Sequence, residues 1–336
     1  MIKEAIVKLS KKEDLTYQEA ETVMDEIMSG QATPVQMSSY LTALSMKGET
    51  IDEITASASG MRAHCIKLLH DMDVLEIVGT GGDGSNTFNI STLSALVTSA
   101  AGIPVAKHGN RAASSKSGAA DCLDALGVNI KTSPEKAAKC LETTGIAFLF
   151  AQVFHGAMRF VAPVRKEIGC RTFFNILGPL TNPALADYIV LGVYDESLLT
   201  LMANVLIKLG IKGAMVVNGS DGLDEITMTG KTHVCEVKDG KISTYDIDPH
   251  DYGFEYCTAD VLKGGTPEEN AKMTLDILTG KDKDARRNTV LLNAGCAIYC
   301  AGRAATIADG VKLAAEMIDS GKAYDKLNEM KDFTNS

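Results

Sequence analysis

Two glycine- and serine-rich stretches contain the residues whose types and spacing are suited to binding phosphate. They are residues 79–92, GTGGDGSNTFNIST, and residues 107–118, KHGNRAASSKSG. The first follows the β-branched run 74–78 and precedes an apolar stretch with helical spacing, which predicts a strand, a loop and a helix N-terminus. Such a loop directs several backbone N–H groups into one concavity, and the helix dipole adds partial positive charge, so phosphate is the expected ligand. The stretch lacks the spacing of dinucleotide-binding loops and of P-loops. A tight turn would also explain several of its glycines.

Polar side chains are concentrated in and after these loops. Helix capping alone would account for one of the two hydroxyls of Ser91 and Thr92. Residues 107–111, KHGNR, place three side chains that can carry positive charge within five residues, and Ser114 and Ser115 follow. These residues suit a phosphate group, and the alternative is an ordinary solvated loop.

A guanidinium in an otherwise apolar segment forms a third candidate. Arg165 follows His155 on a predicted helix after the strand 146–150. A planar guanidinium binds a carboxylate with two parallel hydrogen bonds, which suggests a carboxylate ligand. A structural ion pair with Glu167 or Asp187 would explain the same residue.

Adjacent carboxylates follow the predicted strand 214–217 in residues 221–225, DGLDE. Beside phosphate loops they suggest Mg²⁺ shared with substrate phosphates, and the alternative is a solvated acidic turn. Residues 178–183, GPLTNP, form a rigid stretch that is explained equally well as a turn. All these clusters follow predicted strands, where open α/β sheets bind ligands. Together they imply a ligand with several phosphates, a magnesium requirement and a separate pocket for a carboxylate.

The elements that must position these residues divide the chain in two. Residues 1–70 read as four helices, with capping-box spacing at Thr16 and Thr50 and proline after Thr33. Beyond them, short β-rich runs alternate with helical segments, and Asp239-Gly240 predicts a hairpin between 232–237 and 241–246. The sequence therefore predicts an α/β protein with a small all-helical domain, residues 1–70, and a larger α/β domain, residues 71–336, with a mixed central sheet. The predicted strands before the hairpin are 74–78, 103–106, 128–130, 146–150, 188–193 and 214–217.

Composition excludes several functions. A chain of 336 residues exceeds the usual size of one hydrophobic core. The net charge of −10, from 33 basic and 43 acidic residues, argues against nucleic acid as the main partner. The eight cysteines form no CxxC pair, which indicates free thiols in a reducing cytosol. Lys3 and Glu4 stand where the apolar core of a signal peptide would begin, so export is not expected. The most apolar stretch, residues 146–164, contains Gln152, His155 and Arg159, so a membrane span is not expected either.

The combined motifs resemble one known family. GTGGDGSNTFNIST, KHGNRAASSKSG, HGAMRFVAPVRKEIG with RTFFNILGPLTNP, and DGLDE are similar to the motifs of anthranilate phosphoribosyltransferases, which join anthranilate to phosphoribosyl pyrophosphate in tryptophan biosynthesis. The resemblance covers nearly the whole chain. It implies a cytoplasmic homodimer of the nucleoside phosphorylase/phosphoribosyltransferase type, in which part of residues 165–183 returns to the helical domain.

The resemblance also implies site residues by position. Anthranilate would contact Gly79, Asn110, His155 and Arg165, while Ser91, Asp224 and Glu225 would hold magnesium, with two ions per monomer. No residue is expected to be an indispensable general base. The residues implied for phosphoribosyl pyrophosphate are Gly79, Gly82, Asp83, Thr87, Asn89, Ile90, Ser91, Thr92, Lys107, His108, Gly109, Asn110, Arg111, Ala112, Ala113, Ser114, Ser115 and Ala119.

Position 119 departs from the family, which usually has serine there. Ala119 lacks the hydroxyl, and this puts one contact with phosphoribosyl pyrophosphate in doubt.

Two rival functions fit the same fold class. A pyrimidine nucleoside phosphorylase would have a similar glycine loop but would need no acidic magnesium pair, so Asp224 and Glu225 weigh against it. A non-catalytic member that binds single-stranded nucleic acid would need a basic groove with stacking aromatic residues. This chain is acidic and has no tryptophan.

Overall fold

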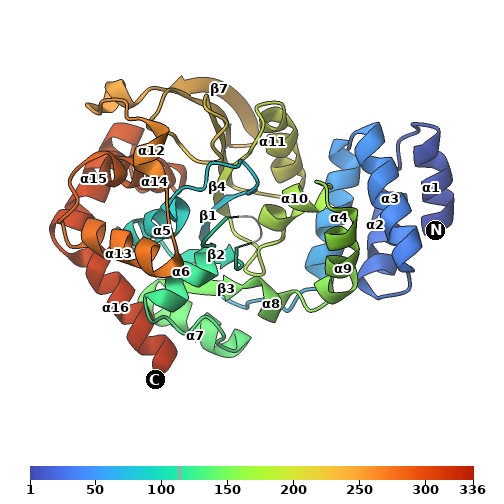
Figure 1. Cartoon of the computed structure of the whole chain (residues 1–336), viewed down its shortest axis with the longest axis horizontal. Helices are drawn as coiled ribbons and strands as arrows, with labels where there is room; N and C mark the ends of the chain where they lie inside the picture. The colour runs from blue at the N-terminus through green and yellow to red at the C-terminus, as the bar shows by residue number, and fades with distance from the viewer. Residues whose placement is uncertain (113–114) are drawn as a thin grey trace.

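The protein consists of a helical region beside an α/β region (Figure 1). The structure, a computed structural model, describes residues 1–112 and 115–336. The chain begins in the helical region with α1 (Ile2–Ser10), α2 (Tyr17–Met28), α3 (Pro34–Lys47) and α4 (Ile51–Ala63). The side chains of Thr16, Thr33 and Thr50 each accept a hydrogen bond from the third residue of the helix that follows. The helix starts predicted from capping are therefore confirmed.

A later segment of the chain returns to these helices. Helix α9 (Met158–Ile168) packs against α2 and α3, while α10 (Phe174–Leu177) and the short helix η1 (Gly178–Thr181) contact α4 (Figure 1). Arg62 of α4 donates a hydrogen bond from Nε to the carbonyl of Leu180, 2.7 Å away. The helical region is thus built from two separate parts of the sequence.

The central sheet has the strand order β3-β2-β1-β4-β5-β6-β7. Strands β1 to β5 run parallel to one another, β6 runs antiparallel to β5, and β7 runs antiparallel to β6. The mixed sheet and the hairpin are therefore confirmed. The chain adds β2 and β3 on one side of β1 and then crosses to add β4 on the other side. Ligands in open sheets bind at the carboxyl ends beside such a switch point. The strands are β1 (Leu75–Gly79), β2 (Val105–Gly109), β3 (Ile146–Phe150), β4 (Tyr188–Gly192), β5 (Gly213–Gly219), β6 (Thr232–Lys238) and β7 (Lys241–Ile247).

Helices cover the sheet and bury two hydrophobic clusters. Helix α5 lies against β1, β2 and α14, whereas α11 packs on β5 and β6 and also contacts α4. Helix α14 is buried along most of its length. The remaining elements are α5 (Ile90–Ala100), α6 (Ala119–Ala125), α7 (Pro134–Thr144), α8 (Ala151–Phe154), α11 (Leu198–Lys208), η2 (Pro249–Tyr252), α12 (Ala259–Leu262), α13 (Pro267–Leu278), α14 (Ala285–Cys300), α15 (Ile307–Asp319) and α16 (Lys322–Asn335).

The strand predicted at residues 128–130 is wrong. These residues connect α6 to α7 without pairing to a strand. Val128 and Ile130 are nevertheless 2% and 3% exposed. A short apolar run is common to buried strands and to buried connections, and here it fills the core beneath two helices.

Within the described residues, no helix combines the length and the apolar content needed to cross a membrane.

A buried carboxylate holds the helical region together. Glu53 accepts hydrogen bonds from the backbone N–H groups of Leu15 and Thr50, at 2.9 and 2.8 Å, and from Lys47 Nζ at 2.9 Å. The Glu53 and Lys47 side chains are 0% and 4% exposed, so the ion pair is desolvated.

Glu53→Gln should lower the free energy of unfolding by about 2–3 kcal/mol, because it leaves a buried ammonium with only Asp14 as an anionic partner. Chemical denaturation measures this change. The control is Lys208→Ala, which breaks the half-exposed pair with Asp52 and should change stability very little. Equal effects of the two substitutions would contradict the importance assigned to Glu53.

Candidate active site

The centre of the site lies where β1 and β4 end side by side. Gly79 and Gly192 are paired in the sheet, and Asp224, on the loop after β5, packs against both. A Cβ at Gly79 would lie 2.3 Å from Asp224 Oδ2, and one at Gly192 would lie 1.6 Å from the Asp224 carbonyl oxygen. Only glycine permits so close an approach of another backbone. The DGLDE loop is therefore held directly over the switch point of the sheet.

The glycine loop after β1 is folded tightly and joined to Asp224. Gly81, Gly82 and Gly84 have φ values of 71°, 79° and 78°, which residues with a side chain rarely adopt. The N–H of Gly81 donates to Asp224 Oδ2 at 2.6 Å. These glycines therefore have a conformational role in addition to any contact with a ligand.

The start of α5 presents polar groups that the protein does not satisfy. Thr92 is 2% exposed, and its hydroxyl oxygen has no hydrogen-bond partner within the described part of the chain; the same holds for the Thr80 hydroxyl. The helix N-cap, Asn89, makes no capping hydrogen bond with its side chain. The Thr92 hydroxyl at the helix N-terminus and the Thr80 hydroxyl in the loop after β1 are therefore suited to bind ligand oxygens.

Buried carboxylates face this helix end. Ser91 donates its backbone N–H to Glu225 Oε1 at 3.2 Å. Burial raises the pKa of Asp224, and the charge of Asp83 raises it further; burial and then the charge of Asp224 raise the pKa of Glu225. Among the described residues, neither Asp224 nor Glu225 forms an ion pair with lysine or arginine.

These carboxylates suit a magnesium ion. No group of three His, Cys, Asp or Glu side chains in residues 1–112 and 115–336 could hold a metal alone. Mg²⁺ is commonly bound through one or two carboxylates, with substrate phosphates and water completing the shell. The buried carboxylates of Asp224 and Glu225, beside the unpartnered Thr92 hydroxyl at the start of α5, match that requirement.

A third buried carboxylate, that of Glu76, organises the end of β2. Glu76 is fully buried and accepts hydrogen bonds from the His108 N–H, at 3.0 Å, and from the side-chain amide of Asn182. Lys107 Nζ lies 3.9 Å from Glu76 Oε1. Lys107 and His108 are thus held at the carboxyl end of β2 through their link to β1. Sequence reasoning missed Glu76, although a lone carboxylate in an apolar strand must find partners.

Two neutral histidines lie beside this network. The rings of His108 and His155 have centroids 5.0 Å apart, and each side chain is 7% exposed with no described partner for Nε2. Burial lowers the pKa of His155 to about 4 and also lowers that of His108. Both imidazoles are uncharged near neutral pH and offer unsatisfied ring nitrogens to a ligand.

Arg165 lacks the ion pair that the sequence left open as an alternative. Its half-buried guanidinium lies 5.6 Å from the ring centre of Phe174 and has no acidic partner among the described residues. Asp187 pairs with Lys212 at 3.0 Å instead. Arg165 is therefore available for an anionic ligand.

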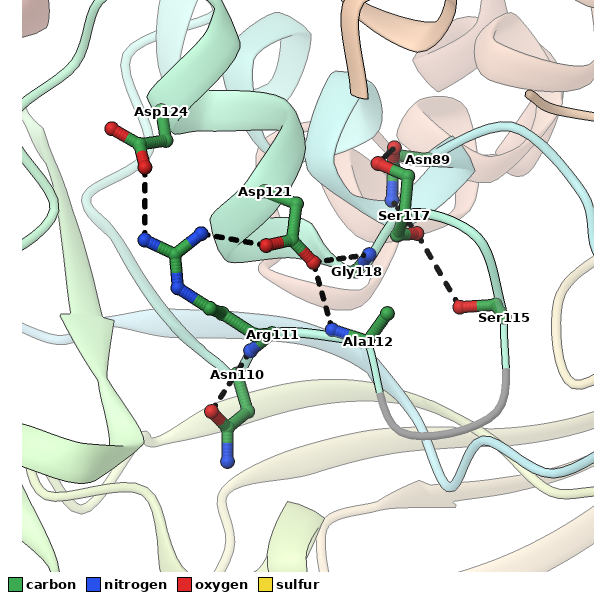
Figure 2. A network of polar contacts seen from close by, with 9 residues as sticks. All are labelled: Asn89, Asn110, Arg111, Ala112, Ser115, Ser117, Gly118, Asp121 and Asp124. Carbon is green, nitrogen blue, oxygen red and sulfur yellow. Dashed lines mark hydrogen bonds and ion pairs between the residues drawn. The ribbon is translucent and has the colours of Figure 1, made fainter. Parts of the chain in front are cut away.

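The second loop is linked to the first. The Asn89 side chain donates to the Ser117 carbonyl at 3.2 Å and accepts from Asn270 at 2.9 Å. The guanidinium of Arg111 contacts Asp121 and Asp124 (Figure 2). The Ile90 side chain belongs to the core and is 1% exposed. Of the other predicted phosphate ligands, Ala113 and Ser114 lie outside the described residues.

Arg171 is another residue that sequence reasoning missed. It lies between α9 and α10, stacks on Tyr194 with the guanidinium carbon 4.1 Å from the ring centre, and donates to the carbonyl of Gly82. It therefore links the returning segment to the glycine loop. No pattern near Arg171 in the sequence indicates this partner.

Comparisons with known proteins agree with this geometry. Residues 3–65 match the helical bundle domain of the glycosyl transferase family, and residues 71–324 match its a/b domain. The anthranilate phosphoribosyltransferase from Methanobrevibacter smithii is 61% identical to this chain, and the match covers 100% of both chains. The enzyme of the same name from Lachnoclostridium phytofermentans is 57% identical, and the match covers 100% of this chain and 99% of the relative.

Solved structures are similar throughout. The crystal structure of anthranilate phosphoribosyltransferase from Thermus thermophilus has a TM-score of 0.94 at 46% identity and covers 99% of both chains. The enzyme from Saccharomyces cerevisiae in complex with PRPP and Mg has a TM-score of 0.92 at 29% identity, covering 99% of this chain and 98% of the other.

The two matched domains, a helical bundle and an α/β domain, place the chain in the glycosyl transferase family. Within that class, the chain belongs to the anthranilate phosphoribosyltransferase family.

The titration of Glu76 predicts a pH dependence of stability. Burial raises the pKa of Glu76 from its ordinary value of 4.5 to about 7. Between these pH values the folded protein keeps a proton that the unfolded chain loses, so the contribution of Glu76 to stability is present below pH 4.5 and is lost as the pH rises to about 7.

Glu76→Gln removes this titration. The free energy of unfolding of the wild type minus that of Glu76→Gln should therefore fall by about 3 kcal/mol across the same pH range. Denaturant titrations of both proteins at a series of pH values measure the difference. A difference that stays constant with pH would contradict the prediction.

Proposed function

We propose that the chain transfers the phosphoribosyl group of 5-phosphoribosyl 1-pyrophosphate to the amine of anthranilate, giving N-(5-phosphoribosyl)anthranilate and pyrophosphate, in tryptophan biosynthesis. The observation that carries the proposal is the meeting of the start of α5, where the buried Thr92 hydroxyl has no partner in the described chain, with the buried pair Asp224 and Glu225. The yeast relatives were solved with PRPP and Mg and with 4-fluoroanthranilate.

Phosphoribosyl pyrophosphate would lie against the glycine loop, the start of α5 and the segment after β2. The Thr92 hydroxyl, which has no hydrogen-bond partner in the described chain, suits a phosphate oxygen at the start of α5. Lys107 is buried and carries a positive charge, so it also suits a phosphate group. The proposed contacts are Gly79, Gly82, Asp83, Thr87, Asn89–Thr92, residues 107–115 and Ala119.

Magnesium would be held by Ser91, Asp224 and Glu225, with two ions per monomer. A bound Mg²⁺ supplies neutralisation of the charge that develops on the leaving pyrophosphate. The buried carboxylates support this assignment because, within the described chain, neither forms an ion pair with lysine or arginine, although the charge of Lys107 lowers the pKa of Glu225.

Anthranilate would be bound by Gly79, Asn110, His155 and Arg165. The unpaired guanidinium of Arg165 suits its carboxylate with two parallel hydrogen bonds. The Nε2 atom of neutral His155 suits a polar group of the aromatic ring.

The residues of the chain act mainly by positioning. The aromatic amine is already neutral, so it needs placement beside C1 of the ribose more than activation. A histidine whose pKa is lowered to about 4 is a weak base near neutral pH. We therefore assign no indispensable general base to this site.

We extend the proposal to assembly and domain division. The α/β domain would begin at residue 71, with part of residues 165–183 joining the helical domain, and the packing of α9 on α2 and α3 supports this division. A cytoplasmic homodimer is expected from the family. Val35 and Met46 on α3 are 76% and 79% exposed, and a partner subunit would cover such apolar side chains.

The activity is tested by the fluorescence of anthranilate. Mixed with phosphoribosyl pyrophosphate and Mg²⁺, the protein should consume anthranilate and lower its fluorescence, and chelation of the metal with EDTA should stop the loss. Restoring Mg²⁺ should restart the loss. Fluorescence that stays constant with the metal present would contradict the proposed reaction.

Arg165→Ala should raise the KM for anthranilate by about 10- to 100-fold, because charge-assisted hydrogen bonds to a carboxylate are lost. The KM for phosphoribosyl pyrophosphate should change little. Lys166→Ala, at the next and exposed position of α9, is the matched control. A rise in the KM for phosphoribosyl pyrophosphate alone would place Arg165 at the other substrate.

A further inference from the structure

The guanidinium of Arg111 is bound by two aspartates of α6. Its Nη1 atom donates to Asp121 Oδ1 at 2.7 Å and its Nη2 atom to Asp124 Oδ2 at 2.9 Å (Figure 2). The guanidinium is 39% exposed, so these ion pairs are partly screened by water. Their main effect is to orient the side chains that they join.

Asp121 makes further contacts that Asp124 does not. Its Oδ2 atom accepts hydrogen bonds from the backbone N–H of Ala112, at 2.8 Å, and from that of Gly118, at 3.0 Å. These two residues flank the serine-rich stretch after β2 (Figure 2). One carboxylate therefore joins the two ends of that loop.

The ends of the loop also touch through their backbones. A Cβ at Gly118 would lie 2.5 Å from the Ala112 nitrogen and 2.7 Å from the Asn110 carbonyl oxygen. The Ala120 N–H donates to the same carbonyl at 3.2 Å. We call the contact of Asn110 and Ala112 with Gly118 the neck of the loop. It depends on the glycine at position 118 and on the carboxylate of Asp121.

The far side of the neck is attached to the start of α5. Asn89 donates to the Ser117 carbonyl, and the Ser117 hydroxyl lies 3.4 Å from Asn89 Oδ1 (Figure 2). Asn89 directly precedes the helix that carries Ser91 and Thr92. A shift of the neck would therefore move the second phosphate loop relative to the first.

Helix capping explains only part of this arrangement. Asp121 is the third residue of α6, and its bond to the Gly118 N–H is that of a capping box. A helix cap requires neither the Ala112 bond nor the Arg111 bond. Burial alone would raise the pKa of Asp121, but the hydrogen bonds from Ala112, Arg111 and Gly118 lower it.

We propose that Asp121 is a positioning residue for phosphoribosyl pyrophosphate: its carboxylate closes the neck between Ala112 and Gly118, and Arg111 acts by orienting that carboxylate. The proposal rests on the proposed function. Pre-organising a binding loop removes an entropy cost that substrate binding would otherwise bear. One contact proposed above is thereby revised: the guanidinium of Arg111 supports the loop by binding Asp121 and does not itself bind phosphate.

The test compares substitutions at the two aspartates. Asp121→Ala should raise the KM for phosphoribosyl pyrophosphate by about tenfold or more and leave the KM for anthranilate within about twofold. Asp121→Asn should have an intermediate effect, because its amide oxygen still accepts from the backbone but carries no charge for Arg111. Asp124→Asn is the matched control and should behave as the wild type, since Asp124 contacts Arg111 but no part of the neck.

A double-mutant cycle tests the role of Arg111. If Arg111 acts through Asp121, then Arg111→Ala should raise the KM for phosphoribosyl pyrophosphate in the wild type and add nothing to Asp121→Ala. Additive effects would overturn this role and make Arg111 a direct ligand. Thermal unfolding of each variant shows whether the fold is retained.

Two results would overturn the role of Asp121. One is an unchanged KM for phosphoribosyl pyrophosphate in Asp121→Ala, and the other is an equal rise of both KM values, which indicates general damage to the site. Calorimetric titration with phosphoribosyl pyrophosphate and Mg²⁺ separates this question from the reaction itself. Wild-type protein that binds this substrate but transfers nothing to anthranilate would overturn the proposed function and leave the comparison of Asp121 variants valid.

Discussion

The site depends on the contact between the backbone of Asp224 and two paired glycines. Strands β1 and β4 are neighbours because the chain changes direction across the sheet at β1, and this leaves their carboxyl ends open. Because Gly79 and Gly192 have no side chain, the loop after β5 packs directly against those ends. The Gly81 N–H then binds Asp224, so the glycine loop takes its conformation from the acidic loop. Any side chain at these two glycines would collide with Asp224 and displace the acidic loop from the glycine loop.

The site has an apparent conflict of charge. A ligand with several phosphates is expected beside Asp224 and Glu225, which are both buried and acidic. Magnesium resolves the conflict, since it is attracted by both sets of oxygens. In the proposed site, a hydroxyl such as that of Thr92 would bind a ligand oxygen without neutralising the carboxylates. Lys107 contributes positive charge, but its Nζ atom donates a hydrogen bond to the carbonyl of Ile77 and lies 3.9 Å from Glu76 Oε1. These contacts hold the ammonium group beside β1.

Features encoded locally were predictable from the sequence, and features that join distant segments were not. Capping boxes and the hairpin turn depend on residues within four positions of each other, and the structure has them as predicted. The apolar run 128–130 was misread because burial does not distinguish a strand from a connection. Glu76 and Asn182 are 106 residues apart, so nothing local reveals that they bind each other. The choice between two roles of Arg165 likewise depended on Lys212, a distant residue that pairs with Asp187.

The returning segment from α9 to β4 explains how the helical region contributes to the proposed site. Three of its side chains reach different parts of the site: Arg165 is free for a carboxylate, Arg171 binds the glycine loop, and Asn182 binds Glu76. Arg62 of α4 holds the same segment by the carbonyl of Leu180. In the proposed site, a movement of the helices would therefore change the surroundings of both substrates at once. The division of the chain into two regions does not separate structure from function, because the segment that completes the helical bundle also carries residues of the site.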